Sequence, residues 1–188
     1  MAEELLPADV ELYTKGRLSR TDPGVERALA SAKARVRRFC GWHVSPVATQ
    51  TISLDGNGDI YLFLPTLKVV NLTAITEDGV ALDVAEIERS VECPGMLIKK
   101  SRGHWARGYG NIEVTFEHGF TADEAQDWRE AVLSLIDQAS LTVGTGRNGP
   151  VISKRVDDVQ MSWSGLPNEV ENAPLDRKAL STYRLLAI

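Results

Sequence analysis

The chain has 188 residues, of which 43% are hydrophobic and 25% charged, proportions typical of a globular protein that buries a core. No apolar run approaches the roughly 20 residues of a membrane span, and the N-terminus lacks the basic start and apolar stretch of a signal peptide. We therefore expect a cytosolic protein without a membrane partner, in which Cys40 and Cys93 are reduced thiols.

The formal net charge is −5, but the charges are unevenly distributed. Between residues 15 and 40 the acids Asp22 and Glu26 are outnumbered by basic residues, which leaves the rest of the chain strongly acidic. The basic residues are Lys15, Arg17, Arg20, Arg27, Lys33, Arg35, Arg37 and Arg38. Such polarity suits nucleic acid or a complementary protein surface, and the acidic total disfavours a sequence-specific DNA reader.

A short helix is expected over residues 8–15, and a longer one over 22–40. Asp22 is a good N-cap, Pro23 suits the first helical position, and Gly41 is a natural stop. The apolar residues recur at helical spacing and form one stripe: Val25, Ala28, Leu29, Ala32, Val36, Phe39 and Cys40. Ala30 and Ala34 lie on the opposite face, where they reflect either helix propensity or a flat surface for another helix.

The apolar period then changes from that of a helix to that of a strand. Strands are expected at Thr49–Leu54, Ile60–Leu64, Val69–Thr76, Val80–Leu82, Met96–Lys99 and Ile112–Phe116. Asp55–Asp59 and Asp78–Gly79 have the composition of hairpin turns, so the pattern predicts a compact antiparallel module.

Helix returns at Thr121, which has capping-box spacing to Glu124. A glycine-rich loop follows at 144–150, then a short hairpin at 152–163 and a final helix over 174–186. We therefore expect an α+β fold with three main helices in a single domain over 1–188. Residues 1–41 and 121–188 form its helical scaffold, and residues 47–117 form an inserted small antiparallel β module.

No motif indicates catalysis or a cofactor. Asp55–Asp59 begins like a calcium loop, but Ile60 and Thr66 stand where glycine and glutamate are needed. The 144–150 loop has Pro150 where a phosphate loop needs lysine. We expect no catalytic residue, no metal and no cofactor, so the protein is not predicted to be an enzyme.

One alternative from another class stays open: a small metal-binding protein or enzyme that uses His43, His104 and His118. Of the possible ligands, only Cys40 and His43 have local zinc-ligand spacing, and no second close pair exists.

The order of segments carries a family resemblance. Helix 22–40, CGWHVSPV, the LDG turn at 54–56, LPTLKVVNLTAIT and EDGVALD resemble the head-to-tail adaptor (connector) proteins of tailed bacteriophages, those of actinobacterial phages above all. A strand running into Trp105, then GNIEVTFEHGF, a helix and TYRLLAI continue the likeness. It covers about residues 8–188 and rests on structural rather than catalytic motifs.

The resemblance implies a structural virion protein, made in the host cytoplasm and located at the head-tail neck. Such adaptors form a ring, commonly of twelve copies, that docks beneath the portal protein and extends the DNA channel. They offer an attachment surface to the stopper or tail, and double-stranded DNA passes without sequence-specific binding. An alternative within the same neck is a stopper or tail-completion protein.

Three sets of residues are candidates for assembly. The resemblance implies that the C-terminal segment docks on the portal, through Tyr183, Arg184, Leu185, Leu186 and Ile188. The basic helix suggests subunit contacts at Arg27, Ala30, Ala34, Arg35 and Arg38, so charge reversal at Arg35 and Arg38 is expected to weaken the ring. A flexible channel or interface loop is expected at Gly144, Thr145, Gly146, Arg147, Asn148 and Gly149.

Overall fold

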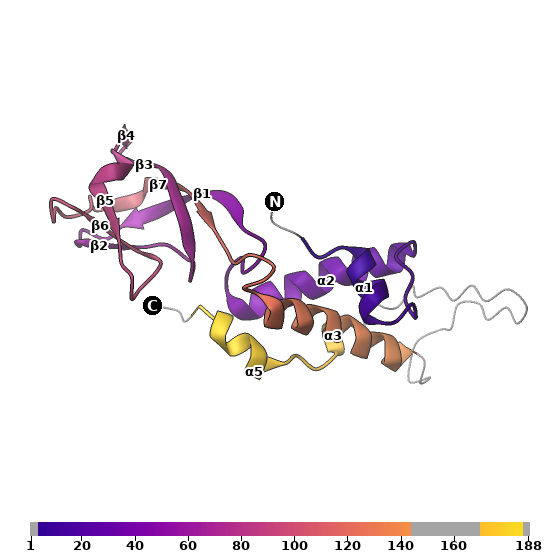
Figure 1. The fold of residues 1–188 in the computed structure, drawn as a ribbon. Helices are drawn as coiled ribbons and strands as arrows, with labels where there is room; N and C mark the ends of the chain where they lie inside the picture. Colours follow the sequence, from indigo (N-terminus) through magenta and orange to yellow (C-terminus); the bar gives the residue numbers. More distant parts are fainter. Residues whose placement is uncertain (1–3, 144–169, 186–188) are drawn as a thin grey trace, which may run out of the picture. The chain divides into compact units, whose positions relative to one another are not determined.

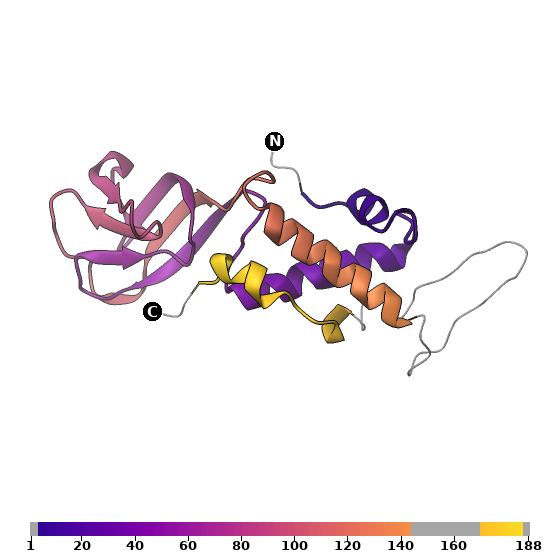
Figure 2. The same cartoon turned by 60° about the horizontal axis from the view of Figure 1, so that its bottom comes forward.

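The computed structural model describes residues 4–143 and 170–185, which form two compact units (Figures 1 and 2). The helical unit comprises residues 4–41, 125–143 and 170–184, and the β unit comprises residues 42–124. An α+β fold, with an antiparallel module inserted between helices, is therefore confirmed. Within the described ranges, no helix is long and apolar enough to cross a membrane.

Two long helices dominate the helical unit. α2 (Pro23–Cys40) and α3 (Gln126–Val143) have 18 residues each and pack against one another in both views (Figures 1 and 2). The short α1 (Pro7–Tyr13) contacts both, while α5 (Arg177–Leu180), continued by the 3-10 turn η2 (Ser181–Tyr183), contacts α3. The buried core includes Val10, Val25, Leu29, Val36, Trp128, Val132, Leu135, Ile136 and Leu180.

The ends of α2 are those that the sequence predicts. The Asp22 carboxylate accepts a hydrogen bond from the backbone N–H of Gly24 at 2.7 Å, and Pro23 occupies the first helical position. Gly41 ends the helix with φ of 83°, a left-handed conformation that favours glycine. At the last position, burial raises the pKa of the Cys40 thiol to about 11, so this cysteine is an unreactive core residue.

Seven strands of the described chain form two antiparallel sheets in the β unit. The larger sheet has the order β1-β7-β3-β4, with bounds β1 (Ala48–Gly56), β7 (Gly108–His118), β3 (Val69–Glu77) and β4 (Val80–Ala81). The smaller sheet has the order β2-β6-β5, with bounds β2 (Tyr61–Phe63), β6 (Met96–Lys99) and β5 (Ile87–Arg89). The 3-10 turn η1 (Val84–Glu86) leads into β5.

One hydrophobic core joins the two sheets. The larger sheet contributes Leu72, Ile75, Ile112, Val114 and Phe116, the smaller sheet Leu62 and Leu97, and the loop before β7 contributes Trp105. Arg89 donates from β5 to the carbonyl oxygens of Val69 and Val70 in β3, at 3.2 and 3.0 Å. Arg89 therefore ties the smaller sheet to the larger one along one side of the core.

The two predicted hairpin turns have different outcomes. Asp78 and Gly79 do connect β3 to β4, with Thr76 opposite Ala81, so this hairpin is confirmed. The prediction of a hairpin at 55–59 is wrong, because β1 pairs with β7 whereas β2 pairs with β6. Asp55 instead accepts a hydrogen bond from the N–H of Gly110 at 2.6 Å. Contacts with this distant segment direct the chain from one sheet to the other.

The helices of the C-terminal half begin later than predicted. Thr121 and Glu124 do form the reciprocal hydrogen bonds of a capping box, yet α3 starts at Gln126. The last helix was expected over 174–186, but α5 starts at Arg177 because the Asp176 carboxylate accepts from the N–H groups of Lys178 and Ala179. The N-cap Asp176 thus overrides the helix-start signal of Pro174, two residues earlier.

Candidate assembly surfaces

One side of α2 presents small and basic side chains. Arg27, Ala30, Ala34 and Arg38 follow one another at steps of three and four residues, and all four are exposed. Residues at this spacing lie along one line on a helix, so the two alanines form a flat strip between two arginines. Arg27 makes no ion pair with any described residue. The strip is thus flat in its middle and carries a positive charge at each end.

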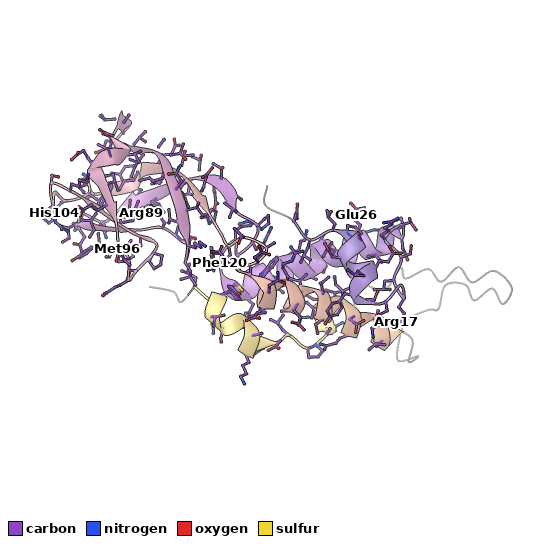
Figure 3. All side chains as sticks on the ribbon, viewed as in Figure 1. Arg17, Glu26, Arg89, Met96, His104 and Phe120 are labelled. Atoms are coloured by element: carbon purple, nitrogen blue, oxygen red, sulfur yellow. The ribbon has the colours of Figure 1, made fainter. Side chains whose placement is uncertain are left out.

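Three other cations of the basic segment form ion pairs inside the helical unit. Arg17, labelled in Figure 3, binds the carboxylate of Asp137 in α3. Lys33 binds Glu4 at 2.8 Å, and Arg20 lies 3.5 Å from Glu11. These bonds neutralise part of the basic surface, so the patch available to a partner is narrower than the count of basic residues indicates.

Arg35 and Arg38 hold the chain's own C-terminal segment. The Arg35 guanidinium donates to the carbonyl oxygen of Val170, and Arg38 lies 3.1 Å from the Glu171 carboxylate. The side chains of both arginines line an open groove of about 590 Å³ between α2 and residues 171–177. Of the five predicted interface residues, Arg35 and Arg38 therefore have an intramolecular role, although Arg38 is exposed, as are Arg27, Ala30 and Ala34.

The C-terminal segment is anchored to the helical unit by Tyr183. This side chain is only 8% exposed, and its pKa is raised first by burial and then by the negative charge of Asp127. Arg184 follows it on the surface, with its guanidinium carbon 5.5 Å from the centroid of the Phe39 ring. Leu185 is half-buried. Among the predicted docking residues, Leu186 and Ile188 lie outside the described residues, as does the whole 144–149 loop, which stays a prediction.

The three histidines are not grouped as metal ligands. The Nδ1–H of His104 donates to the Gly58 carbonyl oxygen 2.9 Å away, whereas the Nε2–H of His43 donates to the Pro46 carbonyl oxygen. Only His43 and His118 are close, with ring centroids 5.5 Å apart. Across residues 4–143 and 170–185, no three His, Cys, Asp or Glu side chains are placed to hold one metal ion.

A buried aromatic cluster around His118 was not expected from the sequence. Phe116 and Trp42 contact this imidazole at centroid distances of 4.8 and 6.1 Å, and Phe120, labelled in Figure 3, packs on Trp42. His118 is 2% exposed, and burial, followed by the charge of His43, lowers its pKa to about 4. The burial of His118 could have been predicted from strand alternation. Ile112, Val114 and Phe116 are buried, and they point to the same side of β7 as position 118.

Comparisons with known proteins concern nearly the whole chain. The model of a family described as head completion protein matches residues 7–138. No curated protein matches the sequence.

Three solved structures share the fold. A chain in the neck of an empty gene transfer agent (GTA) particle, computed with C6 symmetry, matches with a TM-score of 0.63 and 11% identity over 98% of this chain and 91% of that one. A chain in the neck of the native GTA particle, computed with C12 symmetry, has a TM-score of 0.58 and 13% identity, covering 100% and 96%. A chain in the virion of the native GTA particle has a TM-score of 0.54 and 13% identity, also covering 100% and 96%.

Proposed function

This chain belongs to the head completion protein family, structural proteins of the virion neck, and from this premise we propose that it is the head-to-tail adaptor. In this role, about twelve copies form a closed ring beneath the portal protein. The ring extends the channel through which double-stranded DNA passes, and its far side receives the stopper or tail-completion protein. The net charge of −5 on each copy favours passage of DNA over binding, because like charges repel.

The observation that carries the proposal is the match of the complete fold to a neck chain of a particle computed with C12 symmetry. That match includes the β unit as well as the helical unit, since it covers 100% of this chain. A ring requires two different contact surfaces on every copy. The exposed strip of Arg27, Ala30 and Ala34 on α2 is one surface of the kind that a ring needs.

We assign portal docking to Arg184 and the residues that follow it. Tyr183 is buried and serves as the anchor, so the segment leaves the helical unit from a fixed point. Arg184 is exposed there, and the sequence continues with Leu185-Leu186-Ala187-Ile188. An arginine followed by apolar residues suits a groove with an acidic rim on the portal. Deletion of residues 186–188 should abolish portal binding, whereas Tyr183→Phe should preserve it.

Negative-stain microscopy of the purified protein, alone and with the portal protein of the same particle, tests the proposed role. Rings on the narrow end of the portal are the expected result. A protein that does not bind the portal and binds only to a preformed adaptor ring would be a stopper. A protein that stays monomeric in the presence of the portal and of the adaptor ring would contradict a neck role. Metal analysis of the same preparation tests the alternative that uses the histidines.

A further inference from the structure

The outer face of the smaller sheet in the β unit is unusually apolar. Tyr61 lies opposite Ile98, and Phe63 lies opposite Met96, in the pairing of β2 with β6. Between them Leu62 lies opposite Leu97, and both of these point into the core. Because side chains alternate across a strand, the two outer pairs share the face that points away from the core.

Contacts of neighbouring residues confirm which way this face points. Arg89 lies opposite Leu97 and reaches inward to the carbonyl oxygens of β3, and Lys99 lies over the Trp105 ring at 4.7 Å. Met96 and Arg89 are labelled in Figure 3. Tyr61 and Phe63 are 37% and 39% exposed. Aromatic and methionine side chains on a solvated sheet face are typical of protein interfaces rather than of free surface.

A second apolar surface lies between α1 and α3 in the helical unit. Leu12 is 81% exposed, and it lines an open groove of about 340 Å³ with Tyr13 and Leu133. The groove is bordered by Asp9 and Glu130, so its rim is acidic. Arg129 lies deeper, where it is 3.9 Å from the Asp9 carboxylate.

The rims of the two surfaces carry opposite charges. Exposed Lys100 follows β6, and Arg102 comes close to the outer sheet face, where it lies 3.6 Å from Glu88. That ion pair is exposed on both sides and therefore weak, so Arg102 can exchange Glu88 for a carboxylate of a partner. Lys100 and Arg102 thus outnumber Glu88 around the apolar sheet face, whereas Asp9 and Glu130 outnumber Arg129 around the apolar groove, so the two net charges are opposite.

We infer that the outer face of β2 and β6 in one copy docks on the α1–α3 groove of a second copy. This inference rests on the proposed ring and identifies surfaces that would close it. One chain carries both surfaces, and they differ from each other, which is the requirement for a head-to-tail contact. Two copies of the sheet face alone would form a twofold dimer and leave the acidic groove without a partner.

Two variants that each destroy one surface test the contact. Phe63→Asp places a negative charge on the apolar sheet face, and Leu12→Asp places one in the apolar groove. Sedimentation velocity should show that wild type self-associates, and that each variant alone has a dissociation constant raised by about tenfold or more. A mixture of the two variants should form a dimer and nothing larger. The intact groove of the first variant then meets the intact sheet face of the second.

The controls replace exposed hydrophobic residues elsewhere on the same units. Tyr109→Asp in the β unit and Leu141→Asp on α3 should associate like wild type, because neither residue belongs to the two surfaces. Circular dichroism checks folding, and Phe63→Thr and Leu12→Ser serve as milder replacements if an aspartate unfolds the chain.

Several outcomes overturn the inference. Variants that associate like wild type, a mixture that forms no dimer, or a wild type that stays monomeric would each exclude this contact. The first two outcomes leave the proposed function intact, since rings on the portal can still close through the α2 strip. Absence of rings on the portal is the separate result that contradicts the proposed function.

Discussion

Gly56, at the end of β1, lies where no side chain fits. A Cβ atom at this position would be 1.7 Å from the carbonyl oxygen of Ala106. Gly56→Ala must displace either β1 or the segment before β7, so we expect the free energy of unfolding to fall by about 3 kcal/mol or more. Urea denaturation measures the change.

Gly79→Ala is the matched control for this prediction. Gly79 has φ of 78° but nothing within 4 Å of its Cβ position, so only the backbone conformation is strained. The expected loss is about 1 kcal/mol. Equal losses at the two glycines would show that the close approach to Ala106 has no energetic weight.

Burial of the neutral imidazole of His118 makes stability depend on pH. Its folded pKa of about 4 lies below the ordinary value of 6.5, so between these values the unfolded chain binds a proton that the folded chain does not. Stability contributed by this group is complete above pH 6.5 and falls as the pH decreases toward 4. The loss should be on the order of 3 kcal/mol.

Chemical denaturation across this pH range tests the prediction. His118→Gln should remove most of the slope of stability against pH, whereas the exposed His104→Gln should leave it unchanged. The prediction is wrong if the slope persists without His118.

Single residues also show why parts of the candidate site escaped prediction. Exposure of Ala30 and Ala34 follows from helix periodicity, which is a local property of the sequence. The intramolecular bonds of Arg35 and Arg38 join α2 to residues more than 130 positions away, and no local pattern encodes such a contact. The same holds for Tyr183, whose burial depends on tertiary packing.

At the scale of elements, Asp176 determines where the last helix begins. Its carboxylate accepts hydrogen bonds from the N–H groups of Lys178 and Ala179, at 3.1 and 3.0 Å. Asp176→Ala should therefore lower the free energy of unfolding by about 1 kcal/mol, the usual value of a lost N-cap. Asp176→Asn retains an acceptor oxygen and should lose much less. Equal effects of the two substitutions, measured in urea, would contradict the capping role.

Helix ends and the 78–79 hairpin could be predicted because their signals are contained in a few adjacent residues. The sheet order could not, since β1 finds its partner β7 across about 60 residues, and the 55–59 turn has the composition of a hairpin without forming one. Long-range pairing is decided by the shared core around Trp105 and Phe116 rather than by turn residues.

At the scale of the whole molecule, the order of segments was more informative than any single motif. Helix 22–40, the β module and the later helix follow one another as in the adaptor family, and the match to the head completion protein family confirms that resemblance. The solved neck chains share the fold of this chain at only 11–13% identity, so the order of segments is recognisable where the individual residues differ.

A large side chain at position 34 of α2 tests whether this helix lies at the interface between copies in the ring. The strip on α2 is flat because Ala30 and Ala34 have no more than a methyl group, so in the proposed ring Ala34→Trp would place a large ring system between α2 and a neighbouring copy. Position 34 is exposed in the single chain, and we expect stability to change by no more than about 0.5 kcal/mol. Ring formation on the portal should nevertheless be lost. Ala81→Trp, at an exposed alanine of β4, is the matched control and should still give rings. Normal rings from Ala34→Trp would remove α2 from the subunit interface and leave the contact between the sheet face and the α1–α3 groove to close the ring.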